Sequence, residues 1–252
     1  MKISRPMFKV SGEKWLIKDW IISEFPEKYE EMTYVEPYGG SVSVLFGKKK
    51  SKIEVINDSN LELVNIYKAI RDEGQDFLKK ISSYKCTQEN FSKLIKKTIH
   101  DDYLDQAVND LFLRKSSKNG LKNVFQKPSS EEFWKDSIQN IKLFSQRINE
   151  VFIFGKFALE IISSLNTPDT LLYCDPPYLH DNKVSKMVYQ SEMTTECHMN
   201  LQRLLNNFKG KVVLSGCMSP LYKRIYKDWN IAKTRVNKTS KEKTTEIIWK
   251  NF

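Results

Sequence analysis

The sequence is poor in the residues from which covalent and metal-based sites are built. Only four cysteines and three histidines occur in 252 residues. The cysteines stand singly, without the paired spacing of zinc sites or the density of a disulfide scaffold, and the histidines form no ligand cluster. We therefore expect reduced thiols with mostly structural roles, and no metal centre.

Long apolar runs are also missing. No stretch approaches the roughly 20 apolar residues that a membrane helix requires, and residues 1–6 lack the apolar core of a signal peptide. We therefore expect a soluble, cytoplasmic protein with no membrane partner. Hydrophobic residues make up 40% of the chain, which suffices for one sizeable core and favours one domain with room for an insertion.

Negative charge is scarce relative to positive charge. The 41 Lys and Arg residues outnumber the 31 Asp and Glu residues, which gives a formal net charge of +10. Much of the excess lies after residue 208, where eleven basic residues accompany three acidic ones. Such an excess suits a polyanion such as nucleic acid. On composition alone, a solvated basic surface explains it equally well.

What the chain does contain is an alternation of short apolar runs with amphipathic patterns, which predict strands and helices respectively. In chain order these are strand 32–35, strand 53–56, helix 61–70, strand 171–174, helix 195–208 and strand 211–215. Alternating units of this kind are typical of an α/β fold with a doubly wound, mostly parallel sheet and helices on both faces.

Two parts of the chain break this alternation. Residues 229–236 and 244–249 flank a polar, basic stretch, a pattern typical of an antiparallel hairpin that closes the sheet. Between residues 84 and 150 the sequence is mostly helical and polar. We interpret 84–150 as an inserted helical subdomain, with 1–83 and 151–252 forming the domain that it interrupts.

The most informative motif is Asp175-Pro176-Pro177-Tyr178, directly after a predicted strand. Doubly wound folds bind their ligands at the carboxyl ends of strands. The prolines fix the backbone and donate no hydrogen bond, so the Asp175 carboxylate and a rigid carbonyl can together accept both hydrogens of a planar amino group. Two such acceptors also stabilise the charge that develops when the amine attacks. The motif thus predicts activation of an aromatic amine; a plain loop is the alternative.

Two further turns follow predicted strands. Glu36 precedes a Gly39-Gly40 turn, where glycines let a ligand approach the backbone and an acid can hold an ammonium group. Asp58 follows Gly40 by 18 positions, close to the spacing of about 20 at which nucleotide-binding folds place a ribose-binding acid. A helix N-cap is the alternative role of Asp58.

In this order, the motifs resemble the Dam-like alpha group of adenine-specific DNA methyltransferases. The resemblance covers nearly the whole chain, so the combination is far more specific than any one motif. Its matching residues are Gly12, Lys14, residues 36–41, Asn57, Asp58, residues 63–65, residues 175–178, Met193, Thr194, His198, residues 210–216 and residues 246–251. The resemblance implies a Rossmann-like methyltransferase sheet.

The resemblance further implies S-adenosylmethionine as cofactor, double-stranded DNA as partner and no metal. The residues that it assigns to the cofactor are Lys14, Glu36, Tyr38, Gly40, Asp58 and Asp175. It assigns three groups to catalysis: Asp175 and the Pro176 carbonyl take the target amine, and Tyr178 stacks on a flipped adenine. Direct in-line methyl transfer is the implied reaction.

DNA contacts are expected from two regions, one implied by the resemblance and one by the basic charge of the closing hairpin. An Asn-Gly segment at residues 113–120 looks like the segment that lies beside the substrate in the family, within a target-recognition subdomain. The residues predicted to contact DNA are Arg114, Lys115, Lys118 and Asn119 there, and Lys238, Lys241 and Lys243 in the closing hairpin. An ordinary helical insertion and a solvated hairpin are the alternatives.

Departures from the family pattern concern the cofactor side. Glu13 stands where a glycine is common, Val10 where an aromatic residue is common, and Val42 where a third small residue is common. Lys156 lies where many relatives carry an acid near the cofactor adenine. These departures leave open a catalytically impaired nucleic-acid-binding relative, and the catalytic motifs leave open the same reaction on RNA adenine. The recognised base sequence and a partner restriction nuclease also stay open.

Overall fold

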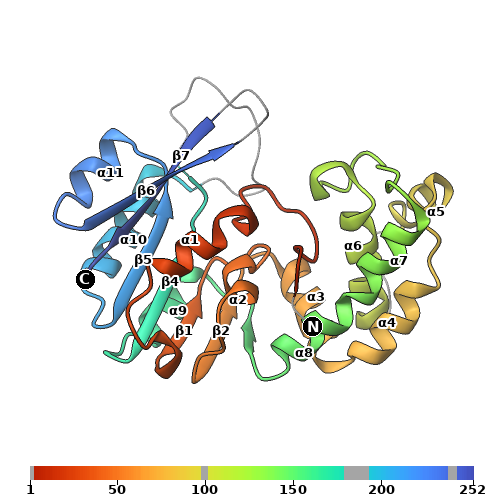
Figure 1. The fold of residues 1–252 in the computed structure, drawn as a ribbon, viewed down its shortest axis with the longest axis horizontal. Helices are drawn as coiled ribbons and strands as arrows, with labels where there is room; N and C mark the ends of the chain where they lie inside the picture. The colour runs from red at the N-terminus through yellow and green to blue at the C-terminus, as the bar shows by residue number, and fades with distance from the viewer. Residues whose placement is uncertain (1–2, 98–101, 179–192, 238–242) are drawn as a thin grey trace.

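The structure, a computed structural model, describes residues 3–97, 102–178, 193–237 and 243–252. Within these residues, seven strands form one sheet in the order β3-β2-β1-β4-β5-β7-β6 (Figure 1). The first five are parallel, and β7 pairs antiparallel with both β5 and β6. The strands are β1 (Thr33–Glu36), β2 (Ile53–Asn57), β3 (Phe152–Phe154), β4 (Thr170–Cys174), β5 (Lys211–Gly216), β6 (Asn230–Asn237) and β7 (Lys243–Lys250). The predicted mostly parallel α/β sheet with a C-terminal hairpin is confirmed.

Helices cover both faces of the sheet because its central strands are apolar on both sides. Side chains alternate between the faces of a strand, so Tyr34 of β1 joins one apolar core and Val35 joins the other. The first core also takes side chains from α1 (Lys18–Ser23), α2 (Ser43–Gly47) and α3 (Leu61–Asp72). The second takes side chains from α9 (Ala158–Ser164), α10 (Thr195–Asn206) and α11 (Pro220–Ile225).

Strand β3 is the element of the sheet that the sequence analysis misses. It has three residues, pairs only with β2 in the described part of the chain, and leaves Phe152 55% exposed. A run this short, at the edge of a sheet, carries neither the length nor the continuous burial by which a parallel strand is recognised in sequence.

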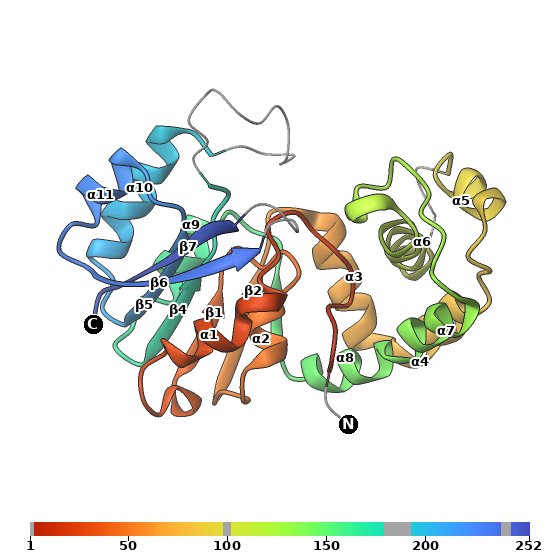
Figure 2. The ribbon, with the colours of Figure 1, turned by 45° about the horizontal axis from the view of Figure 1, so that its top comes forward.

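A layer of helices lies beside α3, on the side that faces away from the sheet (Figures 1 and 2). Its helices are α4 (Gly74–Ser82), α5 (Gln88–Leu94), α6 (Tyr103–Lys115), α7 (Glu131–Gln139) and α8 (Ile141–Ile148). At its centre, the ring of Phe112 on α6 contacts Tyr84 and Trp134 edge to face, with centroids 5.5 and 5.6 Å away. Within the described ranges, no helix is both long and apolar enough to cross a membrane.

The helical layer shares its core with the sheet. One apolar cluster runs from Leu171 of β4 through α3 into α6 and α8. Helix α4 ends before residue 84, yet it packs against α6, α7 and α8. The layer therefore begins earlier in the chain than the 84–150 segment, and the division into 1–83 with 151–252 and an inserted 84–150 subdomain stays a prediction.

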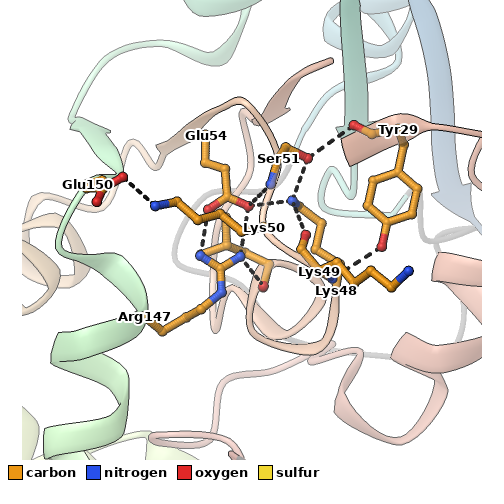
Figure 3. A network of polar contacts seen from close by, with 9 residues as sticks. Tyr29, Lys48, Lys49, Lys50, Ser51, Glu54, Arg147 and Glu150 are labelled. Carbon is orange, nitrogen blue, oxygen red and sulfur yellow. Dashed lines mark hydrogen bonds and ion pairs between the residues drawn. The ribbon is translucent and has the colours of Figure 1, made fainter. Parts of the chain in front are cut away.

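A buried ionic network fastens the last helix of this layer to the sheet (Figure 3). The Arg147 guanidinium on α8 donates to both carboxylate oxygens of Glu54 on β2, at 2.5 and 2.8 Å, and to the Leu45 carbonyl at 2.9 Å. Lys48 also binds Glu54 and donates to Ser51 Oγ at 2.8 Å. The Glu54 side chain is only 2% exposed, so these partners compensate a charge that would otherwise be costly to bury.

Replacement of Arg147 should therefore destabilise the chain much more than loss of a surface ion pair. We expect Arg147→Met to lower the free energy of unfolding by about 3 kcal/mol or more, as is typical when a buried charge loses a partner. Lys50→Ala, which removes the exposed Lys50–Glu150 pair beside it, is the control and should cost less than about 1 kcal/mol. Urea unfolding measures both, and equal losses would show that the network adds nothing specific.

Candidate active site

The carboxyl ends of β1, β2 and β4 meet at one edge of the sheet because these three strands are parallel neighbours. A cavity of about 760 Å³ opens there. Its lining includes Lys14, Glu36, Tyr38, Gly40, Asp58, Asp175 and Pro176. The structure thus brings together all the residues predicted to bind the cofactor and two of the three predicted catalytic groups.

The turn after β1 is held tightly on both sides. Gly40 has a φ of 52°, in the left-handed region that glycine adopts without strain. Its amide donates to Asp58 Oδ2 at 2.7 Å, and its carbonyl accepts from the Tyr67 hydroxyl at 2.7 Å. At the neighbouring Gly39, a Cβ would lie 3.1 Å from the Asn57 carbonyl oxygen. The glycines therefore let the two loops approach each other at the cavity wall.

Asp58 is not the N-cap of the following helix. Asn60 is the cap of α3, and its side chain accepts from the Glu62 amide at 3.0 Å. Asp58 instead links the loop after β1 to the loop after β2. One of its carboxylate oxygens accepts from the Gly40 amide, and the other accepts from the Asn60 amide at 2.8 Å. Burial raises the pKa of Asp58, and the two backbone amides oppose this rise. The carboxylate is thus fixed beside the cavity with lone pairs left for a ligand.

Glu36 is the most deeply buried acid of the cavity, with 2% of the residue exposed. Burial raises its pKa to about 8, and the negative charge of Asp175 adds to this rise, whereas Lys48 opposes it. One of its carboxylate oxygens has no hydrogen-bond partner among the described residues. Because a buried ion is stable only with a compensating charge, Glu36 suits a cationic group in the cavity.

Asp175 belongs to a compact ionic cluster at the mouth of the cavity. Its Oδ2 lies 2.9 Å from Lys14 Nζ, and its Oδ1 accepts from the Tyr178 hydroxyl at 3.2 Å. The Lys14 ammonium also lies 4.8 Å from the centre of the Tyr178 ring. Tyr178, the third predicted catalytic residue, is thus beside Asp175, with its hydroxyl turned toward the carboxylate.

Glu246 is a member of this cluster that the sequence analysis did not single out. It accepts a hydrogen bond from Tyr178 and lies 3.8 Å from Lys14 Nζ. The pairing of Gly216 with Ile247 places it just beyond the end of β5, at the same edge of the sheet. Burial raises the pKa of Glu246 to about 7, with Asp175 adding to the rise and Lys14 opposing it. The sequence signal was its position at the start of the family-like stretch 246–251.

Two residues predicted to contact DNA are engaged inside the protein. The Arg114 side chain is 9% exposed and donates to Glu62 on α3 at 2.6 Å. The Lys115 ammonium donates to the Met7 carbonyl at 2.8 Å, and burial lowers its pKa to about 8. Both cations therefore tie α6 to neighbouring segments, a role that differs from the phosphate contact we expected. Their binding to DNA stays a prediction that requires these bonds to break.

The other predicted DNA contacts have a different placement. Lys118 and Asn119 are exposed at the tip of the loop after α6, and Asn119 also lines the cavity. Lys238 and Lys241 lie outside the described residues. Lys243 begins β7, and its side chain is likewise outside the description. Of the predicted DNA contacts among the described residues, Arg114 and Asn119 thus line the cavity.

One aromatic residue of the cavity also escaped the sequence analysis. Phe157 lines the cavity and is 74% exposed. It follows Lys156, whose amide donates to the Asn57 side chain at 2.9 Å and so holds this turn against β2. A large apolar ring left open at the cavity suits contact with a flat ligand group.

The fold is a Rossmann-like α/β sheet with a cavity at the carboxyl ends of its parallel strands. Comparison with known sequences defines the family: residues 11–243 match the D12 class N6 adenine-specific DNA methyltransferase model. The chain belongs to this family, which confirms the resemblance found in the sequence.

The chain also aligns with curated methyltransferases, two of which it covers along nearly their whole length. The Type II methyltransferase M1.LlaDCHI of Lactococcus lactis subsp. cremoris is 26% identical, with 98% of this chain and 95% of that protein covered. The Type II methyltransferase M.MjaIII of Methanocaldococcus jannaschii is 25% identical, covering 91% and 90%. The DNA N-6-adenine-methyltransferase of Escherichia phage P1 is 24% identical over 90% of this chain but 32% of its own length.

The raised pKa of Glu36 predicts how the unliganded chain responds to pH. Between about pH 4.5 and pH 8 the unfolded chain releases this proton while the folded chain keeps it, so stability falls as pH rises through that window. Glu36→Gln removes the effect. As pH rises across the window, the free energy of unfolding of the variant should increase relative to that of the wild type by on the order of 1 kcal/mol per pH unit. Denaturation at several pH values measures this, with the exposed Glu27→Gln as control; a constant difference for Glu36→Gln would contradict the assignment.

Proposed function

We propose that this chain transfers a methyl group from S-adenosylmethionine to the exocyclic amine of adenine in double-stranded DNA. The observation that carries the proposal is the single cavity shared by Glu36, Asp58 and the Asp175-Pro176 pair. It places acids suited to a charged nucleoside next to two hydrogen-bond acceptors suited to an amine. Family membership supports the same reaction.

The residues of the cavity fit the parts of the cofactor. The buried Glu36, with one unsatisfied oxygen, would hold the ammonium of the methionine part. Asp58 would accept from the ribose hydroxyls, and the Gly40 turn would let the ligand lie against the backbone. The exposed ring of Phe157 would cover the flat base. When bound, S-adenosylmethionine supplies a methyl group activated by the adjacent sulfonium.

The chemistry of the chain itself is positioning and electrostatics. Asp175 and the Pro176 carbonyl would accept the two hydrogens of the target amine, which favours a pyramidal nitrogen whose lone pair is less delocalised into the ring. The same acceptors stabilise the positive charge that develops on nitrogen. Tyr178 would stack on the base once it is rotated out of the duplex, and the released proton would pass to solvent.

DNA binding would come from the loop at Lys118 and Asn119 and from the basic hairpin. The loop borders the cavity, so it lies where a duplex must approach to deliver a base. The helical layer around α6 would then read the flanking sequence. This assignment of the DNA contacts follows from the position of the loop beside the cavity, and it rests on the proposed reaction.

The direct test is expression of the chain in a methylation-deficient host, followed by sequencing of the host DNA with detection of modified bases. We expect N6-methyladenine at one recurrent sequence. Competition between matched DNA and RNA oligonucleotides distinguishes the RNA alternative. A chain that binds S-adenosylmethionine but modifies neither polymer would contradict the proposal.

Asp175→Ala should abolish methyl transfer while the fold persists, because it removes the main acceptor for the target amine. Loss of one such contact typically lowers the rate by about two to three orders of magnitude. Single-turnover methylation of a duplex containing the host-derived site measures the effect. The matched control is Asp169→Ala, which changes an exposed aspartate directly before the first residue of β4, at the end of the strand remote from Asp175. This variant should keep the wild-type rate.

S-adenosylmethionine binding should release a proton from Glu36, because its pKa of about 8 must fall when an ammonium group arrives. Between pH 6 and 7.5 the affinity should therefore rise with pH, approaching about tenfold per unit. Calorimetry in buffers of different ionisation enthalpy measures both the affinity and the proton. Glu36→Gln should bind more weakly and lose this pH dependence; an unchanged profile in the variant would move the ammonium site elsewhere.

A further inference from the structure

Asp175 is already engaged on both oxygens in this structure. Lys14 lies against Oδ2 and the Tyr178 hydroxyl against Oδ1, at 2.9 and 3.2 Å. The proposed transfer needs one of these oxygens to accept a hydrogen from the target amine. At least one of the two present partners must therefore leave Asp175 before the base can bind, and a buried donor that leaves needs another acceptor.

Lys14 also donates to the Gly12 carbonyl at 2.7 Å, and Glu246 offers a further, negatively charged acceptor to both Lys14 and Tyr178. Its Oε1 accepts from the same Tyr178 hydroxyl and lies 3.8 Å from the same Lys14 ammonium. A hydroxyl has one hydrogen, so Tyr178 cannot fully serve Asp175 and Glu246 together. The backbone of Glu246 is held in place because its strand, β7, pairs with β5 on one side and with β6 on the other.

Charge also favours an exchange between the two carboxylates. One ammonium, that of Lys14, faces both the largely buried Glu246 and the partly exposed Asp175, whose side chains are 10% and 18% exposed. A neutral amine that displaces Lys14 from Asp175 leaves the cation in need of a nearby negative charge. Glu246 provides this charge without moving Lys14 out of the cluster, so the cation stays beside the Tyr178 ring.

We propose that Glu246 is a positioning residue, which takes over the Tyr178 hydroxyl and the Lys14 ammonium and so leaves Asp175 free for the target amine. This inference rests on the proposed adenine methylation. In its absence, Tyr178 and Lys14 remain on Asp175 and compete with the substrate. The exchange also keeps the Tyr178 ring in one orientation while its hydroxyl changes acceptor.

A double-mutant cycle tests the proposal through the residue on which Glu246 acts. Glu246→Ala should lower the single-turnover rate at saturating DNA and S-adenosylmethionine by about 10- to 100-fold, the range expected for one hydrogen bond to a charged group. Its affinity for S-adenosylmethionine should stay within about twofold of wild type. Glu246→Gln, which can still accept from Tyr178, should recover part of the rate.

Tyr178→Phe supplies the decisive background. Because this variant has no hydroxyl that competes for Asp175, adding Glu246→Ala should lower the single-turnover rate several-fold less than it does in the wild type. A merely structural role of Glu246 would give multiplicative losses. Glu160→Ala, on an exposed face of α9, is the control and should leave all rates unchanged.

The outcomes separate this inference from the reaction on which it rests. A wild-type chain that does not methylate adenine, or an Asp175→Ala variant of normal rate, would overturn the proposed function. If those two behave as expected, a wild-type rate for Glu246→Ala or a multiplicative cycle overturns the role of Glu246 alone. Should circular dichroism show that Glu246→Ala is unfolded, the cycle of Glu246→Gln with Tyr178→Phe decides, with the same signs.

Discussion

The site depends on the parallel pairing of β1 with β2 on one side and with β4 on the other. Parallel neighbours end at the same edge of a sheet, so the residues that follow them meet although they are far apart in sequence. Glu36, Asp58 and Asp175 come together in this way. The N-terminal segment, the glycine turn and the closing hairpin contribute side chains only because this edge gives them a common meeting point.

The second organising feature is an excess of buried acid in a basic chain. The protein carries a formal charge of +10, yet burial raises the pKa of Glu36 to about 8 and that of Glu246 to about 7. Carboxyl groups with such raised pKa values bind protons or cations readily, because an uncompensated negative charge is costly in a cavity of low dielectric. The interior of the site is thus prepared for positive groups.

Sequence periodicity predicts most of the fold, because the central strands are continuous apolar runs and the helices have clear apolar faces. It misses β3, which is too short, and the packing of α4 with later helices, which depends on contacts distant in sequence. Motif spacing likewise assembles most of the cavity residues, since Glu36 ends a strand and Tyr38, Gly40, Asp58, Asp175 and Pro176 follow one. It does not find Glu246, because an acid in a mostly basic hairpin looks solvent-exposed. Nor does it find the inward orientation of Arg114 and Lys115, because a helix sequence alone does not reveal which cations pair internally.

The apolar cluster that passes from the sheet through α3 into α6 and α8 limits how this protein can be recombined. A helical layer with its own core could be exchanged for that of a relative as a module. Here a transplant of residues 84–150 would meet α4 and the outer face of α3, whose side chains fit the original layer. Close-packed interiors tolerate such mismatches poorly. Exchange of whole segments should therefore cost more stability than substitutions at exposed positions such as 118–119.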